Sequence, residues 1–245
     1  MKERSGKFFG IGVGPGDPEL ISLKAVRILG SVHTIFAASS TKNSHSFAMR
    51  TARPHLPETT PVIKLPFPMT REKKRLKECW RENAATIIKE LEKGKDAAFI
   101  TLGDPLTYST YGYVVREIRK VAPDVEIETV PGITSYQAGA AMVHLPLAEG
   151  EDSLLILSGS QGGEHLRRLG SQVDNIVLLK TYRHFEDIYS TLEEMNLVER
   201  TICIKSCGQP DEKIITDIRE MVDKKMGYFT LLIIKNKQGN RLNPS

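Results

Sequence analysis

GIGVGPGDPELISLKA, residues 10–25, is the most informative segment of this chain. It links an apolar segment, predicted as a β-strand over residues 8–13, to a helical pattern predicted over residues 18–29. Four glycines and one proline fall within residues 10–16. A glycine-rich turn between a strand and a helix is typical of a phosphate-binding loop, so the first question is whether this turn can hold a phosphate.

The residues of this turn argue against a phosphate. A dinucleotide-binding fingerprint requires glycine at position 15 or 17, where the chain has Pro15 and Asp17. A P-loop requires Ser or Thr after a Gly-Lys pair, but Gly6-Lys7 is followed by Phe8 and Gly94-Lys95 by Asp96. Pro15 lacks a backbone N–H donor, and the carboxylate of Asp17, at the predicted N-cap, would occupy the positive helix end that an anion needs. The turn therefore suits close backbone approach by a neutral or cationic group, or it is simply a tight bend.

Strand and helix patterns alternate along all 245 residues, which predicts an α/β fold. A polar, glycine-containing segment at 145–152 separates two such runs, so we predict two domains, residues 1–147 and 148–237, and a flexible tail at 238–245. In the first domain, further strands are predicted at 32–37, 96–102 and 125–130, and helices at 74–93, 111–121 and 136–142. In the second domain, strands are predicted at 153–160, 175–182, 200–208 and 228–236, and helices at 164–169, 185–195 and 217–225.

Composition places the chain among ordinary globular proteins, with 40% hydrophobic and 26% charged residues. No apolar run approaches the roughly 18 residues of a membrane span, and the N-terminus has no apolar region followed by a cleavage site, so we expect a cytoplasmic protein with no membrane partner. Cys79, Cys203 and Cys207 show no metal-binding spacing, so we expect buried thiols and no metal. Helical spacing assigns Cys79 and Trp80 to the core.

Positive charge is concentrated in one segment. The net charge is +4, yet residues 42–81 hold ten Lys or Arg and three Glu, a local charge of +7 that leaves −3 for the rest. This segment indicates an acidic partner, either nucleic acid or a polycarboxylate, or else a solvated helix face. No nucleic-acid-binding motif accompanies the charge, which disfavours nucleic acid as the partner.

Two further loops follow predicted strands of the first domain. ITLGDPLTYST at 100–110 combines glycine, a carboxylate and hydroxyl groups, and TVPGITS at 129–135 combines glycine with hydroxyl groups. Ligands of open α/β sheets bind beyond the carboxyl ends of the strands, so we expect these two loops and the opening turn to converge. Backbone donors, hydroxyls and carboxylates with few cations suit an adenosyl group and a sulfonium better than a triphosphate.

GVGPGDPELISLKA, LGDPLTYST and VPGITS, in this order and spacing, resemble the tetrapyrrole methylases of the cobalamin and siroheme pathways. The similarity continues through LLK at 178–180, SCG at 206–208 and YFTLLI at 228–233. KLPFPM at 64–69, together with the two longer loop motifs, most resembles the members that methylate C-20 of precorrin-2, with or without cobalt. Another regiochemistry within the family, or a noncatalytic tetrapyrrole- or nucleotide-binding module, remains the alternative.

The resemblance implies two α/β domains with a cleft that binds S-adenosylmethionine, a tetrapyrrole trough beside it, a homodimer and no protein-bound metal. The implied activity is methyl transfer from the sulfonium to a meso carbon. By position, the implied cofactor contacts are Gly103, Asp104, Pro105, Tyr108, Ser109, Thr110, Thr134, Ser135, Lys180, Gly208 and Thr230. Gly14, Pro15 and Gly16 would form a proline loop that faces the tetrapyrrole.

Three questions about the site remain open at this level. Asp104 either balances the sulfonium or holds its own loop, and we favour the second role. Arg50, Arg53 and Lys64 are the first candidates to bind the carboxylates of a precorrin. No motif identifies the base that removes the meso proton, for which Tyr108, His33 and Lys180 are the available guesses, and residue types do not determine whether the substrate contains cobalt.

Overall fold

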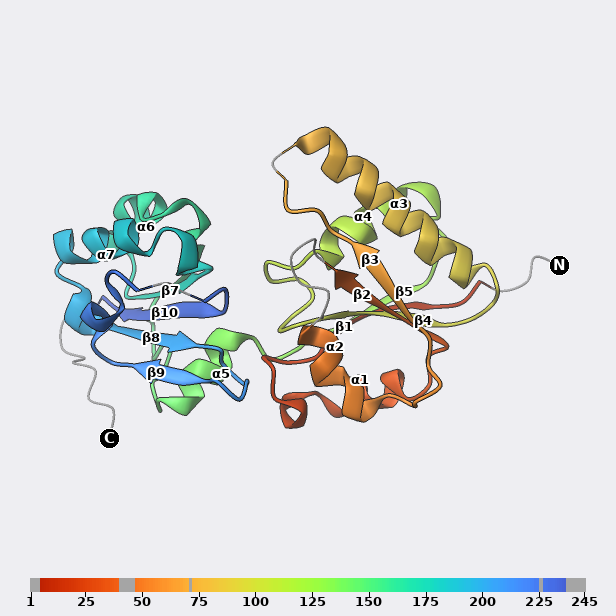
Figure 1. The fold of residues 1–245 in the computed structure, drawn as a ribbon, viewed down its shortest axis with the longest axis horizontal. Coiled ribbons are helices and arrows are strands. Elements are labelled where there is room, and N and C mark those ends of the chain that lie inside the picture. Colours follow the sequence, from red (N-terminus) through yellow and green to blue (C-terminus); the bar gives the residue numbers. More distant parts are fainter. Residues whose placement is uncertain (1–4, 40–46, 71, 225–226, 237–245) are drawn as a thin grey trace. The chain divides into compact units, whose positions relative to one another are not determined.

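The computed structural model describes residues 5–39, 47–70, 72–224 and 227–236 and contains two α/β units, which confirms the predicted fold class (Figure 1). Backbone contacts divide the chain after Thr134, into residues 1–134 and 135–245. Each unit is built around its own five-stranded sheet.

The sheet of the first unit is entirely parallel. Its strands lie in the order β3-β2-β4-β1-β5. Their bounds are β1 Phe8–Gly12, β2 Thr34–Ser39, β3 Val62–Pro66, β4 Ala97–Thr101 and β5 Ile127–Val130. The helices are α1 Leu23–Leu29, α2 Phe47–Ala52, α3 Lys73–Leu91 and α4 Tyr111–Val121. Because all five strands run the same way, their carboxyl ends meet at one edge of the sheet.

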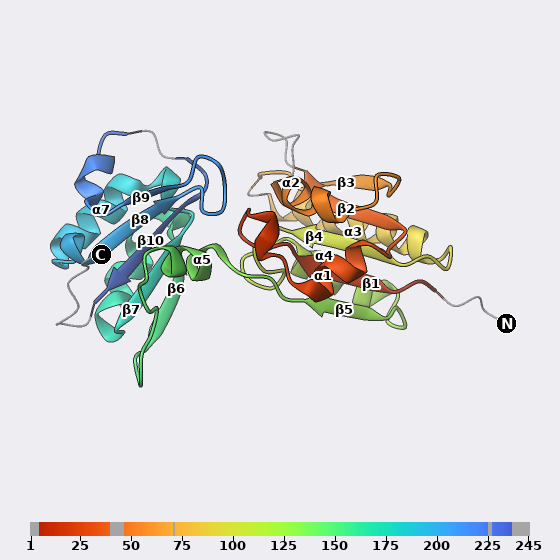
Figure 2. The ribbon, with the colours of Figure 1, turned by 90° about the horizontal axis from the view of Figure 1, so that it is seen from below.

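Helices cover both faces of this sheet, as parallel sheets require (Figures 1 and 2). Alternate strand residues such as Ile11 and Ile35 belong to the core beneath α1 and α2. Phe36 and Phe99 belong to the core beneath α3 and α4. Trp80 packs at the margin of that second core and stacks on Tyr113 with ring centroids 4.2 Å apart, as its helical spacing predicted.

The second unit has a mixed sheet in the order β6-β7-β10-β8-β9, in which only β6 and β7 run parallel. The strands are β6 Leu154–Ser158, β7 Asn175–Leu179, β8 Thr201–Lys205, β9 Lys213–Ile215 and β10 Thr230–Lys235. The helices are α5 Ser135–Met142, α6 Glu164–Leu169 and α7 Phe185–Glu194. In both ribbon views α6 and α7 lie over one face of the sheet and α5 lies against the other (Figures 1 and 2).

The division between the units falls ahead of the boundary predicted at 147. Helix α5 packs on the second sheet, where a Cβ added to Gly139 would lie 2.7 Å from the Ile204 Cδ1 atom. The Sγ atom of Cys207 lies 3.8 Å from the Met142 sulfur, and Lys235 Nζ donates to the Pro146 carbonyl at 2.8 Å. These contacts attach the segment that follows Thr134 to the second unit. The tail predicted at 238–245 lies outside the described residues.

Two predicted helices differ from the structure. Only Leu23–Leu29 of the helix predicted at 18–29 is α-helical, because Ser22 caps it by accepting a hydrogen bond from Ala25 N, and Pro18–Leu20 forms a separate 3-10 turn, η1. Asp17 caps that turn rather than a long helix. The helix predicted at 217–225 is reduced to a 3-10 turn, η7, over Ile218–Met221, which the extended backbone of Val222 ends. Helix α2 and strands β3 and β9 were not predicted.

The three cysteines are buried, as predicted. Burial raises the pKa of the Cys203 and Cys207 thiols to about 12, which leaves both thiols neutral and unreactive at physiological pH. Within the described residues, no three His, Cys, Asp or Glu side chains gather in a group that could bind a metal ion. In the same part of the chain, every helix is too short or too polar to span a bilayer.

Candidate ligand-binding site

Three loops at the carboxyl edge of the first sheet are tied together by hydrogen bonds. They follow β1, β4 and β5, which are neighbours in the sheet. Gly103 N donates to Gly14 O at 2.7 Å, which joins the first loop to the second, and the two residues form an isolated antiparallel bridge. Gly132 N donates to Asp104 Oδ2 at 3.2 Å, which joins the third loop to the second. The structure therefore brings together the three motifs that the sequence singled out.

Glycine is required where these loops cross. A Cβ on Gly132 would lie 2.2 Å from Gly103 O, and a Cβ on Gly12 would lie 2.6 Å from the same oxygen, so no side chain fits at either position. Gly103 differs, because its φ of +72° favours glycine while a Cβ there would meet only Thr134 Cα, at 4.0 Å. The space beside Gly103 and Thr134 is therefore open to a ligand that approaches the backbone.

Asp104 holds its own loop and anchors the next one. Its Oδ1 atom accepts hydrogen bonds from Leu106 N at 2.8 Å and Thr107 Oγ1 at 3.2 Å, and its Oδ2 atom accepts the bond from Gly132 N. Three acceptor positions of the carboxylate are thus used within the protein. This geometry favours the loop-holding role over a role in balancing a sulfonium.

The rest of the second loop presents an apolar rim to solvent. Leu106 is 70% exposed and Tyr108 is 47% exposed, and Tyr108 adopts a left-handed backbone with φ of 51°. Ser109 Oγ accepts a hydrogen bond from Tyr111 N at 3.1 Å, which steadies the entry to α4. Thr110 is the N-cap of α4 without a side-chain capping bond, and Pro105 is buried. Of the predicted contacts in this loop, Tyr108 is the most exposed.

The proline loop is firmly anchored. Gly14, Pro15 and Gly16 are buried, and Gly14 has a φ of +78° that favours glycine. Gly16 O accepts a hydrogen bond at 3.2 Å from Thr51 Oγ1 on α2. In the third loop, Thr134 is buried and Ser135 is the first residue of α5, which places both where the first unit passes into the second.

The predicted residues of the second unit share one edge of its sheet. Lys180 directly follows β7, Thr230 begins β10, and Gly208 lies shortly after β8, whose Lys205 is opposite Thr230 in the ladder. Lys180 and Gly208 have φ values of 60° and 70°. Burial lowers the pKa of Lys180, while Thr230 is buried and its Oγ1 donates to Gly227 O at 2.8 Å.

The three basic candidates for carboxylate binding lie on one face of the first unit. Arg50 is on α2, Arg53 is in the 3-10 turn η2 Arg53–His55, and Lys64 is on β3 opposite Ala37, whose side chain belongs to the core beneath α1 and α2. All three are exposed. Lys42 and Arg71 of the basic segment lie outside the described residues.

His33 is removed from the candidate bases. It is exposed immediately before β2, and its backbone N–H donates to Asp96 O, just before β4. Both positions are at the amino ends of parallel strands, so His33 lies at the edge opposite the three loops.

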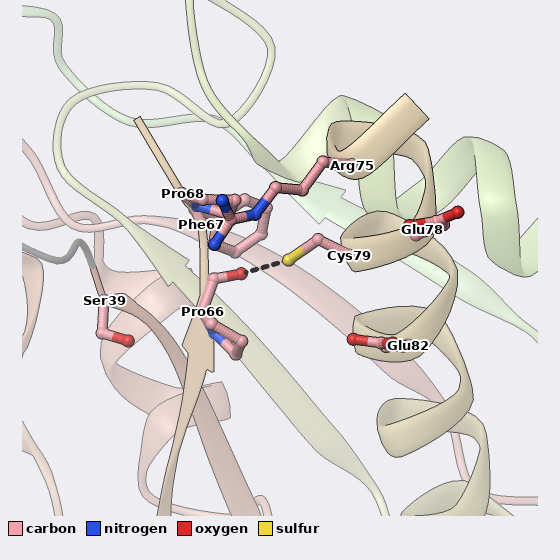
Figure 3. Close-up of a pocket in the computed structure, with 8 residues that line it drawn as sticks. All are labelled: Ser39, Pro66, Phe67, Pro68, Arg75, Glu78, Cys79 and Glu82. Atoms are coloured by element: carbon pink, nitrogen blue, oxygen red, sulfur yellow. Dashed lines mark hydrogen bonds between the residues drawn. The ribbon is translucent and has the colours of Figure 1, made fainter. Parts of the chain in front are cut away.

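A pocket of about 430 Å³ lies where β2 and β3 end against α3 (Figure 3). Its lining residues are Ser39, Pro66, Phe67, Pro68, Arg75, Glu78, Cys79 and Glu82. Cys79 Sγ donates to Pro66 O at 2.9 Å, and burial raises the pKa of this thiol, which keeps it protonated as the donor. Sequence reasoning missed this pocket, although KLPFPM spans the end of β3 and three of the lining residues.

The fold and the interlocked loops define a class: an α/β protein with a glycine-built ligand site at the carboxyl edge of a parallel sheet. Residues 7–222 match the model of the tetrapyrrole (corrin/porphyrin) methylases, and the chain belongs to that family. The chain is 34% identical to a cobalt-precorrin-2 C(20)-methyltransferase of Salmonella typhimurium, covering 96% of this chain and 98% of that protein. It is 27% identical to a precorrin-2 C(20)-methyltransferase of Sinorhizobium sp, covering 94% of this chain and 95% of that protein.

Solved structures share the fold. A cobalt precorrin-4 methyltransferase aligns with a TM-score of 0.69 at 20% identity, covering 94% of each chain. A uroporphyrin-III C-methyltransferase of Thermus thermophilus, complexed with S-adenosylhomocysteine, aligns with a TM-score of 0.65 at 21% identity, covering 94% of this chain and 97% of that one. The predicted family and fold are confirmed.

Proposed function

We propose that this protein transfers a methyl group from S-adenosylmethionine to the meso carbon C-20 of precorrin-2 or of its cobalt form, in cobalamin biosynthesis. The observation that carries the proposal is similarity along nearly the whole chain to C(20)-methyltransferases of both substrate types. The identity to the cobalt-type relative is higher, which favours the cobalt-containing substrate.

The residues present fit the cofactor. The space beside Gly103 and Thr134 admits a ligand at the backbone, and the loops around it offer hydroxyls and carbonyls rather than cations. S-adenosylmethionine would supply an activated methyl group, so the protein needs to bind, orient and shield it. Orientation of two reacting groups is worth about 7–11 kcal/mol of a barrier, which suits a rigid, interlocked set of loops. Lys180, Gly208 and Thr230 stay predictions from the family resemblance.

The direct test uses the purified protein, S-adenosylmethionine labelled in its methyl group, and precorrin-2 with and without cobalt under anaerobic conditions. We expect one new methyl group at C-20, located by mass spectrometry and NMR, and a higher kcat/KM with the cobalt form. A methyl group at another carbon would overturn the regiochemistry but keep the reaction class. Cofactor binding without any transfer would favour the noncatalytic alternative. From the family resemblance we also propose a homodimer and a cytoplasmic location. Analytical ultracentrifugation of the same preparation tests the homodimer.

Removal of the three basic candidates tests their part in substrate binding. We expect the triple substitution Arg50→Ala, Arg53→Ala and Lys64→Ala to raise the KM for the tetrapyrrole by about threefold or more, since each exposed charge contributes roughly 0.2–1 kcal/mol. The dependence of KM on salt should weaken as well, because fewer charges are left to screen. Steady-state kinetics at two ionic strengths measure both effects. An unchanged KM would show that these three residues do not bind the substrate and belong to a solvated surface.

A further inference from the structure

The pocket at the ends of β2 and β3 lies at the same sheet edge as the three loops. Phe67 N donates to Ser39 O at 2.8 Å, which extends the pairing of β2 and β3 beyond Pro66. Since β2 is the neighbour of β4, and strands are spaced by about 4.8 Å, the end of β3 is roughly 10 Å from the second loop across the sheet. A ligand held at the loops would therefore have to extend about this far along the sheet edge to enter the pocket.

The pocket has a rigid apolar wall. Phe67 is buried and meets Phe99 edge-on, with ring centroids 6.1 Å apart. The carbonyl of Pro66 is held from α3 by two donors, Cys79 Sγ at 2.9 Å and Asn83 Nδ2 at 2.8 Å. The end of β3 is therefore fixed against the helix, and the wall is preformed for the methylene groups of a flexible ligand arm.

Arg75 is the only basic residue among those that line the pocket, where Glu78 and Glu82 are the acids. Figure 3 shows Arg75 extending from α3 toward Phe67 and Pro68. In the part of the chain that the structure describes, no carboxylate lies within ion-pair distance of the Arg75 guanidinium. Helix α3 opens with Lys73, Lys74 and Arg75, and its N-cap is the acid Glu72, so positive charge is in excess at the helix end that disfavours cations. An anion bound at Arg75 would relieve this local repulsion.

On the basis of the function proposed above, we propose that this pocket binds one carboxylate side chain of the tetrapyrrole. The guanidinium of Arg75 is its ion-pair partner, and Phe67 and Pro68 contact its methylene groups. Glu78 and Glu82 also line the pocket, but they make no pair with Arg75 and oppose the bound carboxylate at longer range. These two acids make the affinity of the pocket for a carboxylate lower than that of a pocket lined by basic residues alone. Removal of one of them should therefore lower the KM for the tetrapyrrole.

The test compares three single variants of the full chain, with the KM for precorrin-2 and for its cobalt form as the main readout and the Kd for S-adenosylmethionine as the reference. Arg75→Gln should raise both KM values about three- to tenfold, as expected for loss of a partly exposed charge-assisted contact. Glu82→Gln should lower them about twofold, because it removes a repulsive charge. Lys77→Gln makes the same charge change as Arg75→Gln on the same helix outside the pocket, and it should leave both KM values near wild type. All three should keep the wild-type Kd for the cofactor.

Opposite shifts from Arg75→Gln and Glu82→Gln, without a shift from Lys77→Gln, would support the site, since a merely structural role gives no such sign change. Equal effects of Arg75→Gln and Lys77→Gln would overturn it in favour of a diffuse charge effect. A weaker cofactor affinity in Arg75→Gln would overturn it in favour of a distorted loop edge. If wild-type protein neither binds nor methylates a tetrapyrrole, the proposed function has failed and this site fails with it; if wild type is active and Arg75→Gln matches it, only this site has failed.

Discussion

Gly132→Ala is expected to destabilise the first unit by about 3 kcal/mol or more and to abolish cofactor binding. The added Cβ would lie 2.2 Å from Gly103 O in the second loop and 2.8 Å from Gly12 Cα at the end of β1, and both are backbone atoms. Backbone atoms that are fixed by a sheet cannot move aside as a flexible side chain does, so the strain must open the interlocked loops. Denaturant unfolding measures the first effect, and calorimetric titration with S-adenosylmethionine measures the second.

Gly112→Ala is the matched control. Gly112 lies in α4, and a Cβ there would meet nothing within 4 Å. Because alanine favours a helix over glycine, stability should stay the same or rise by up to about 1 kcal/mol, with cofactor affinity unchanged. Near-wild-type stability and affinity in Gly132→Ala would show that the loops are not packed as described.

Asp104→Asn is expected to lower kcat/KM by about 10- to 100-fold and the free energy of unfolding by about 1–3 kcal/mol. An amide oxygen at the Oδ1 position still accepts from Leu106 N and Thr107 Oγ1, but its NH₂ group then faces the N–H of Gly132. Two donors in contact leave the link between the second and third loops broken and one donor unsatisfied. Thr107→Val, which removes only one of the three bonds, should have a clearly smaller effect.

Binding of two ligands separates the two roles considered for Asp104. If the carboxylate holds the loops, Asp104→Asn weakens by the same factor the binding of S-adenosylmethionine and of S-adenosylhomocysteine, which lacks the sulfonium charge. If it balances the sulfonium, only the charged ligand loses affinity. We expect equal losses, measured as Kd values by calorimetry. A loss of affinity for S-adenosylmethionine alone would contradict the structural role. Wild-type affinity for both ligands would exclude both roles of Asp104.

How far sequence reasoning succeeds depends on how local the signal is. Helix α4, Tyr111–Val121, lies where a helix was predicted, because an amphipathic repeat reports directly which side chains are buried. The helix predicted at 18–29 begins only at Leu23 in the structure. The apolar spacing of residues 21–29 includes Ile21, although the backbone of Ile21 and Ser22 is extended, so the spacing alone predicted too early a start. Strand β9 has three residues, too few for a period to appear, and β3 lies among prolines that read as a loop.

The candidate site divides in the same way. From the amino-acid sequence alone we predicted an α/β protein with three glycine-rich loops after three strands, and the order and spacing of those loops indicated the family. The folded chain was needed to show why the glycines are required and what Asp104 holds. It was also needed to show that His33 lies at the sheet edge opposite the loops and that Arg75 lines a pocket with Phe67. The physical reason is that periodicity records the burial of each side chain, whereas the atom that a Cβ or a carboxylate meets comes from loops far away in the chain.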